Sequence, residues 1–133
     1  MSVIEEALVS RVLANATVAA TVGTRVYPVV APEGVTLPAL VYQRISGVRE
    51  HTHDQVGDLA RPRFQFGAIA LTYSAAKALA NAVRSALDNY SGTVLGVRID
   101  AIQVQNEIDT FNASTDEAST YLTWLDFIVW HHE

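Results

Sequence analysis

Apolar residues recur every three or four positions in residues 74–90, the spacing that places side chains on one face of a helix. This apolar stripe comprises Ala76, Leu79, Ala80, Val83, Leu87 and Tyr90. The opposite face is polar and carries Lys77, Asn81, Arg84 and Asp88. Ser74 can cap the first turn, and Ser91-Gly92 can end the helix. Because the stripe consists largely of small side chains, we predict a helix that lies close against a sheet.

A second helical pattern covers residues 2–15. Ser2 and Glu5 have the spacing of a capping box, in which the side chain of each residue accepts a hydrogen bond from the backbone N–H of the other. Ile4, Leu8 and Val12 then line one face. Residues 17–22 are expected to add a short further turn before Gly23.

Strand patterns account for most of the remaining chain. Segments rich in β-branched and aromatic residues are 25–30, 39–49, 63–71, 97–105 and 120–131. The first contains Pro28, which cannot donate to a ladder, so we expect it at a sheet edge or as a connector. The intervening polar segments 33–38, 51–59 and 106–119 are predicted to be loops.

The order of these elements is α-β-β-β-α-β-β. This order predicts an α+β fold, with an antiparallel sheet of about four main strands and two helices packed on one face. The length of 133 residues predicts one domain that spans residues 1–133.

The last strand pattern is apolar on both of its faces. Alternation places one set together, namely Tyr121, Thr123, Leu125, Phe127 and Val129. The other face carries Leu122, Trp124, Asp126, Ile128 and Trp130. Helices can cover one face, and the other needs a second cover. We expect another subunit to supply that cover.

Composition narrows the range of functions. The net charge is −5, with a pI near 5.2, which disfavours tight binding to nucleic-acid phosphates. The chain has no cysteine, so disulfides and thiolate chemistry are excluded. Two early glutamates argue against a signal peptide, and no segment approaches ~20 uninterrupted apolar residues. We therefore expect assembly in a cytoplasm and no membrane partner.

Candidate chemistry is sparse. His51, His53 and Asp54, with Asp58 nearby, have the residue types of a metal site, but a solvated polar loop is the favoured interpretation. The acidic residues Asp100, Glu107, Asp109, Asp116 and Glu117 are scattered, and the last four are expected on a solvated loop edge. No hydrolase, phosphate-binding or metalloprotease motif occurs. The sequence therefore predicts no enzyme, no catalytic residue, no cofactor and no metal.

Aromatic residues are a second kind of candidate. Trp124 and Trp130, together with Tyr42 and Tyr121, have the residue types that dominate interface energies, although core packing would use them equally well. The interface candidates are His51, His53, Asp54, Trp124 and Trp130.

The order of elements and the local sequence resemble the phage tail-completion, or tail-terminator, family of head–tail joining proteins. The resemblance is carried by residues 5–23, 24–47, 61–92 and 125–131. It implies a structural virion protein at the head–tail junction, from a phage, a prophage or a gene transfer agent. Such a subunit forms a ring, commonly a hexamer, that caps the tail tube and ends its polymerisation. The implied partners are sister copies, the tail tube protein and head-completion or connector proteins, while DNA only passes through the bore.

Net negative charge suits such a bore, because a DNA channel should not grip phosphates. A bore lined by Arg25, Arg44, Arg49, Arg61 and Arg63 would weaken this hypothesis. Two alternatives remain open at this stage. One is a small-molecule- or metal-binding α+β domain that uses the loop from His51 to Asp54, and the other is a generic protein–protein adaptor.

Overall fold

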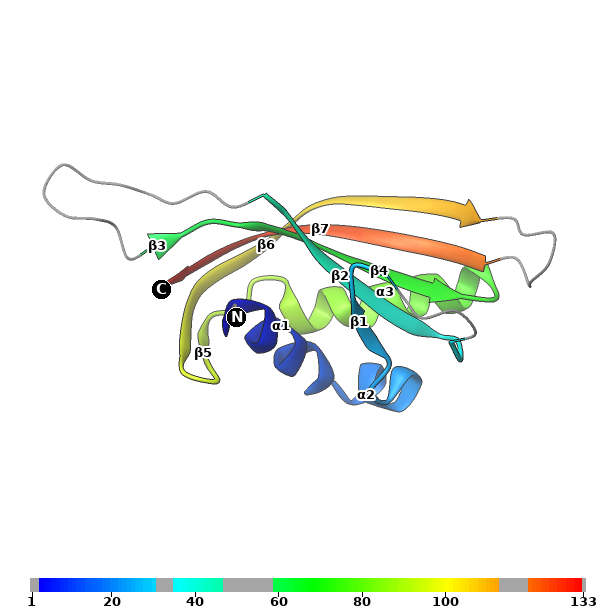
Figure 1. The fold of residues 1–133 in the computed structure, drawn as a ribbon, viewed down its shortest axis with the longest axis horizontal. Helices are drawn as coiled ribbons and strands as arrows, with labels where there is room; N and C mark the ends of the chain where they lie inside the picture. Colours follow the sequence, from blue (N-terminus) through cyan, green and yellow to red (C-terminus); the bar gives the residue numbers. More distant parts are fainter. Residues whose placement is uncertain (1–2, 31–34, 47–58, 113–119, 133) are drawn as a thin grey trace, which may run out of the picture.

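The computed structural model describes residues 3–30, 35–46, 59–112 and 120–132 (Figure 1). Three helices are present in these ranges: α1 Val3–Leu13, α2 Ala16–Val22 and α3 Tyr73–Leu87. The strands are β1 Val26–Pro28, β2 Ala39–Ser46, β3 Leu59–Ala60, β4 Arg63–Ala70, β5 Gly92–Val94, β6 Val97–Asn112 and β7 Thr120–His132. The predicted α+β class is confirmed, whereas the predicted count of two helices and about four main strands is too low.

The strands form one sheet in the order β1-β2-β4-β7-β6-β5, and β3 pairs with the end of β7. All pairs are antiparallel except β1 with β2, which is parallel, so the sheet is mixed. The expected edge position of the segment that contains Pro28 is confirmed. The fully antiparallel sheet was wrong, because a three-residue strand gives no sequence signal for the direction in which it pairs.

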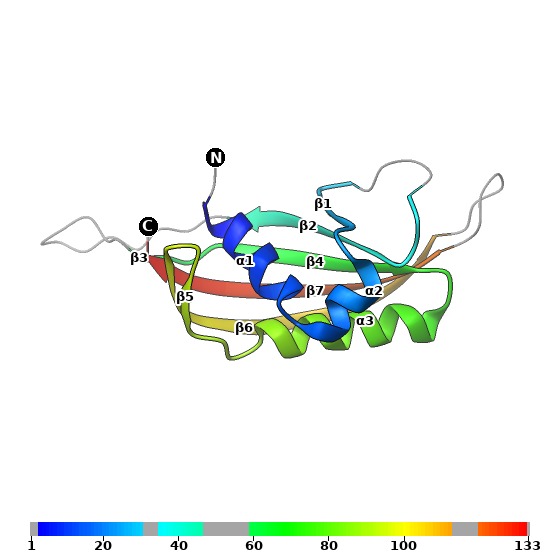
Figure 2. The same cartoon turned by 90° about the horizontal axis from the view of Figure 1, so that it is seen from below.

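All three helices lie on the same side of the sheet (Figures 1 and 2). The predicted stripe of α3 faces it, and Ala76, Leu79, Ala80, Val83 and Leu87 are all buried. The boundaries differ from the prediction. Thr72, and not Ser74, caps the start, because its Oγ1 accepts from the Ala75 N–H at 3.2 Å.

The end of α3 also comes earlier than the Ser91-Gly92 pair predicts. The helix ends at Leu87, and Asn89 takes the left-handed conformation with φ 63°. Asn89 then donates its N–H to the Ile102 carbonyl at 2.8 Å. A tertiary contact to β6 therefore sets the end of this helix.

The helical region at the N-terminus is divided at Asn15. The Asn15 Oδ1 accepts from the Thr17 and Val18 N–H groups, so α2 begins as a separate helix. Gly23 ends it with φ 60°, a conformation that glycine adopts without steric cost. The predicted face of α1 is confirmed, because Ile4, Leu8 and Val12 are buried. Ser2, of the predicted capping box, lies outside the described residues.

The core fills the space between the helices and the sheet. Its largest buried side chains include Phe64, Phe66 and Phe127 from adjacent strands β4 and β7. Phe66 meets Phe127 edge to face, with ring centroids 6.1 Å apart. On its other side, Phe66 stacks on Tyr42 of β2 at 5.9 Å. These rings fix the register of the three central strands.

Strand β6 is longer than predicted. The sequence indicated a strand over residues 97–105 and a loop over 106–119, but the strand continues to Asn112. Register shifts between Ile99 and Ala101, and between Val104 and Asn106, place extra residues in it. Such bulges reset the inward–outward alternation, which hid the second half of the strand from pattern reading. They also bend the strand, and Figure 1 shows β6 curling around the helix layer.

Candidate functional site

One face of the sheet carries no helix, and we call it the open face (Figure 1). Core residues Leu125, Phe127 and Val129 of β7 point to the helices, so the alternate residues of β7 point away from them. The registers of β2, β4 and β6 place further side chains on this side. Its larger apolar members are Val41, Ile69, Ile108, Leu122, Trp124, Ile128 and Trp130.

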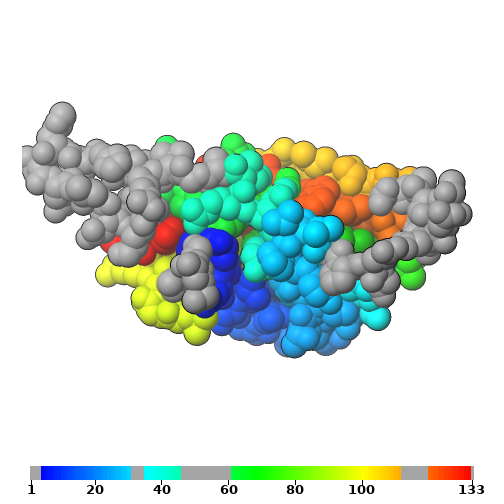
Figure 3. Space-filling view, in the orientation of Figure 1, coloured from blue at the N-terminus to red at the C-terminus, as the bar shows by residue number. Residues whose placement is uncertain are grey.

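Most of these apolar side chains are only partly buried. Ile108 is 44% exposed, and Leu122, Trp124, Ile128 and Trp130 are intermediate. Figure 3 shows β6 and β7 reaching the surface along the upper right of the molecule, where no helix covers them. Exposed apolar side chains gathered on one face mark an interaction surface more often than an ordinary solvated one.

The indole of Trp124 lies across Gly67 of the neighbouring strand. The two residues are register partners, and a Cβ placed on Gly67 would lie 2.5–2.9 Å from three ring carbons. Glycine is therefore required for the ring to approach the β4 backbone. This contact holds the large side chain flat on the open face and keeps one of its surfaces available.

A ladder of polar side chains crosses the open face between the apolar groups. Gln43 donates to the Gln65 side-chain oxygen at 2.8 Å, and Gln65 donates to Asp126 Oδ1 at 2.9 Å. Arg63 lies 3.8 Å from Asp126 Oδ2. The buried Arg63 Nε has no hydrogen-bond acceptor among the described residues. The ladder spans β2, β4 and β7. Its polar groups therefore stay in one row only while the three strands keep their register.

The structure separates the four predicted aromatic candidates. Trp124 and Trp130 share the open face, as the alternation in β7 predicts. Tyr42 instead packs on Phe66 on the helix side. Tyr121 packs on Phe111 and Tyr73, with ring centroids 4.8 and 6.2 Å away. The two tryptophans therefore stay interface candidates, while the tyrosines contribute to packing within the chain.

The predicted loop candidates His51, His53 and Asp54 lie outside the described residues, as do Asp58, Asp116 and Glu117. Within the described ranges, no three His, Asp or Glu side chains come together as metal ligands. His132 Nε2 lies 3.0 Å from Asp100 Oδ2, and Arg98 Nε lies 3.4 Å from the other oxygen of the same carboxylate. That group is an ordinary surface ion pair with a histidine neighbour.

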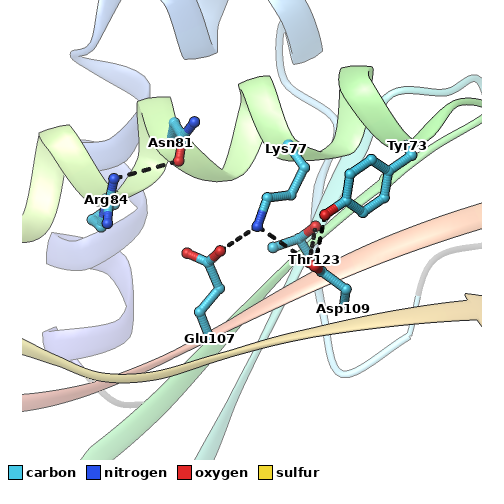
Figure 4. A network of polar contacts seen from close by, with 7 residues as sticks. All are labelled: Tyr73, Lys77, Asn81, Arg84, Glu107, Asp109 and Thr123. Carbon is cyan, nitrogen blue, oxygen red and sulfur yellow. Dashed lines mark hydrogen bonds and ion pairs between the residues drawn. The ribbon is translucent and has the colours of Figure 1, made fainter.

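A polar network joins α3 to the hairpin of β6 and β7 (Figure 4). Lys77 pairs with Glu107 and lies 3.4 Å from Asp109. Asp109 also accepts from the Tyr73 hydroxyl and from Thr123 Oγ1, both at 3.0 Å. The prediction of a loop for Glu107 and Asp109 was wrong, because both stand on β6 and face the helix side, but both are exposed as predicted. The network therefore joins the first turns of α3 to strands β6 and β7.

Sequence reading missed this network, although part of its signal was present. Lys77 was assigned to a solvated helix face, and Thr123 and Tyr73 were given no role. Glu107 and Asp109 are two residues apart, the spacing that places both carboxylates on one face of a strand. The bulge before it concealed the strand, so the pair looked like part of a loop.

The charges of the network set its pH dependence. Burial by itself would raise the pKa of Asp109, but the hydrogen bonds from Tyr73 and Thr123 and the Lys77 charge outweigh it and hold the pKa below 3.8. A lowered pKa gives stability that is present above pH 3.8 and is lost as the pH falls through the folded-state pKa. The hydrogen bond to Glu107 raises the pKa of Lys77 above 10.5, so Lys77 is charged throughout this range.

We expect Asp109→Asn to lower the free energy of unfolding at pH 7 by about 0.2–1 kcal/mol, since the charges are partly exposed. The difference from the unmodified chain should shrink below pH 3.8, where Asp109 takes up a proton. Urea unfolding at pH 7, 5 and 3 measures it. Asp100→Asn, in the separate surface pair, is the matched control, and a difference for Asp109→Asn that stays constant down to pH 3 would contradict the assignment.

The described surface thus combines an apolar open face, a polar ladder that crosses it and a hairpin braced against α3. The chain belongs to the phage tail-completion family, because a sequence model of that family, described as Tail completion protein gp17, matches residues 6–132. It is therefore a structural virion protein of the tail, and the matched family is one of structural proteins.

Two solved structures share the fold of this chain. A chain in a structure titled "Virion of native gene transfer agent (GTA) particle" has a TM-score of 0.78 and 21% sequence identity. The match covers 97% of this chain and 94% of that chain. A second solved chain has a TM-score of 0.54 and 17% identity over 95% of this chain and 92% of its own length. No match is found among curated protein sequences.

None of the described helices has the length and apolar character needed to cross a membrane.

Proposed function

We propose that the chain is a subunit of a ring, a hexamer as its family resemblance implies. This ring caps the tail tube, ends its polymerisation and forms part of the head–tail junction. The observation that carries this proposal is the open face. A single chain leaves Trp124, Ile128 and Ile108 partly or largely exposed on a sheet whose other side is packed against the helices. Sister copies and the last layer of the tube are the surfaces that would cover them.

The proposed mechanism is capping by shape. A rigid sheet with a fixed register presents the same surface in every copy, and closed rings require one such repeated contact. The ladder from Gln43 through Gln65 to Asp126 would select partners that place polar groups opposite it. Membership of the tail-completion family and the fold of the gene-transfer-agent virion chain support this function.

Three of the five arginines named for the bore, Arg25, Arg44 and Arg63, make contacts within the chain, and Arg49 lies outside the described residues. Arg25 donates to the Pro38 and Thr21 carbonyls, and Arg44 pairs with Glu5 at 3.1 Å. Arg63 lies beside Asp126 on the open face. These pairings, with the net charge of −5, support a bore through which DNA passes without being gripped.

The test is the assembly state of the purified chain with and without tail tube protein. We expect rings by light scattering and electron microscopy, and we expect Ile128→Lys to lose them while its melting temperature changes little. A charge at the centre of a protein contact typically costs several kcal/mol, enough to shift association by about 100-fold or more.

Leu95→Lys is the matched control. Leu95 is 61% exposed in the turn between β5 and β6, away from the open face, so this variant should assemble normally. A chain that stays monomeric at every concentration, even beside the tube protein, would contradict the proposed function.

A further inference from the structure

The outer edge of β6 is covered over only part of its length. β5 pairs with residues 97–99 of β6. Next, the end of α3 covers the edge, because Val104 donates its N–H to Asp88 Oδ1 at 3.1 Å and Ile102 accepts from Asn89. In the part of the chain that the structure describes, no strand lies beside residues 106–112 on this edge.

In residues 106–112, every second residue directs its backbone N–H and C=O groups to the outer edge of the sheet. Val129 of β7 donates its N–H to the Pro62 carbonyl at 3.0 Å, on the β4 side, so odd-numbered residues of β7 bond toward β4. The residues of β6 that lie opposite these odd-numbered residues direct their N–H and C=O groups away from β7, to the outer edge of the sheet. Ile102, the partner of Val129, confirms this direction by accepting from Asn89. Glu107, Asp109 and Phe111, the partners of Leu125, Thr123 and Tyr121, therefore present N–H and C=O groups to the edge.

This edge lacks two of the common protections against strand addition, although a bulge precedes it and Glu107 and Asp109 lie on it. Residues 106–112 contain no lysine and no proline, which are common protections of an edge. Their two carboxylates are hydrogen-bonded within the chain to Lys77, Tyr73 and Thr123, and the single charge of Lys77 leaves the pair net negative. Ile108 is 44% and Phe111 54% exposed. The edge thus combines outward backbone groups with two exposed apolar side chains, Ile108 and Phe111, and both features suit the addition of another strand.

We infer that this β6 edge pairs with residues 43–46 of β2 in a second copy of the chain. The inference rests on the proposed ring and adds to it a contact between strand edges, which would join the subunits together with the contacts at the open face. β1 pairs with β2 only at residues 40–42, so no described strand lies beside residues 43–46. Because β2, β4, β7 and β6 alternate in direction, β2 and β6 run antiparallel within one sheet. A rotated copy would therefore bring its β2 antiparallel to β6.

Charges on the helix side of the two edges are complementary. Glu107 and Asp109 face the helix side of β6, with side chains 30% and 37% exposed. Arg44 faces the helix side of β2, where it pairs with Glu5 and keeps 40% of its side chain exposed. Pairing of the edges would place these groups on the same face of the extended sheet, where opposite charges in neighbouring strands attract.

The contact joins two different edges, so it is head-to-tail and generates a ring when the rotation closes. Val41, Gly67, Trp124 and Ile108 are register partners in neighbouring strands, so they lie at one level along the strand direction. Measured from this row, residues 43–46 and residues 106–112 lie at different levels. Successive copies would thus be staggered along their strands, as strands are in closed barrels.

Cysteine cross-linking tests the contact, because the chain has no cysteine of its own. In the double variant Ile45→Cys and Thr110→Cys, both exposed positions lie on the proposed edges. A short bis-maleimide should convert its rings into a ladder of covalent multimers. Each single variant should give none, and the pair Leu95→Cys with Thr110→Cys is the matched control.

Each other outcome is decisive. Dimers from Thr110→Cys alone would show two-fold pairing of β6 edges and overturn the inference. Rings that give no ladder would overturn it and leave the proposed function standing. Failure of the unmodified chain to form rings under any condition would reject the proposed function, and this contact with it.

A backbone variant separates edge pairing from side-chain contact. Phe111→Pro removes an outward N–H, whereas Phe111→Ser removes the same ring and keeps the N–H. We expect proline to raise the concentration needed for assembly about tenfold or more above that for serine, with similar circular dichroism of the two monomers. Equal assembly of the two variants would contradict pairing at this edge.

Discussion

Phe127→Ala is expected to lower the free energy of unfolding by about 3–5 kcal/mol, since it leaves a cavity at the centre of the core. Phe127 is 0% exposed, meets Phe66 edge to face and lies opposite Phe64 in the register of β4 and β7. A domain of this kind has a total stability of about 5–15 kcal/mol, so the loss removes a large fraction of it. Urea unfolding followed by circular dichroism measures the change.

Phe111→Ala is the control, because it makes the same chemical change at a side chain that is 54% exposed. Its ring contacts Tyr121 on the hairpin, so its cost should stay near 1 kcal/mol. Equal losses for the two variants would show that Phe127 is not at the centre of the core.

Gly67→Ala is expected to destabilise the fold by about 1–3 kcal/mol, since the added methyl group would overlap the Trp124 ring. The ring would have to leave the β4 backbone, which also changes the open face. In a Trp124→Ala background the same substitution meets no ring, so most of its cost should disappear. A double-mutant cycle on urea unfolding gives this coupling directly.

Gly96→Ala serves as the control for the cycle. Gly96 has φ +81° and no atom within 4 Å of an added Cβ, so alanine there costs backbone strain alone. That cost should be the same with and without Trp124. If Gly67→Ala costs equally in both backgrounds, the indole does not depend on this glycine.

Local patterns predicted the elements whose signal is complete within a few residues. The stripe from Ala76 to Leu87 identified α3, and the alternation in β7 placed Trp124 and Trp130 on one face. In both cases the period of the backbone fixes the direction of each side chain, so the sequence needs no tertiary information.

Contacts between segments distant in the sequence determined the bounds of other elements. The bulges of β6 shifted its alternation, which hid a strand and the pairing of Lys77 with Glu107 and Asp109. Thr72 displaced Ser74 as the cap of α3, and Asn89 ended that helix through its bond to Ile102. Several residues in each region have suitable chemistry, and the packing of the whole chain selects one of them.

By itself, the sequence determined the α+β class, the main helix and the two-sided apolar character of the last strand, and its resemblance pointed to the tail-completion family that the family model confirms. Only the tertiary structure decided which face of the sheet stays open, how far β6 extends and which edges lack a neighbouring strand. The reason is physical: periodicity sets which side chains share a face, but strand order and register, set by contacts between distant segments, decide what covers that face.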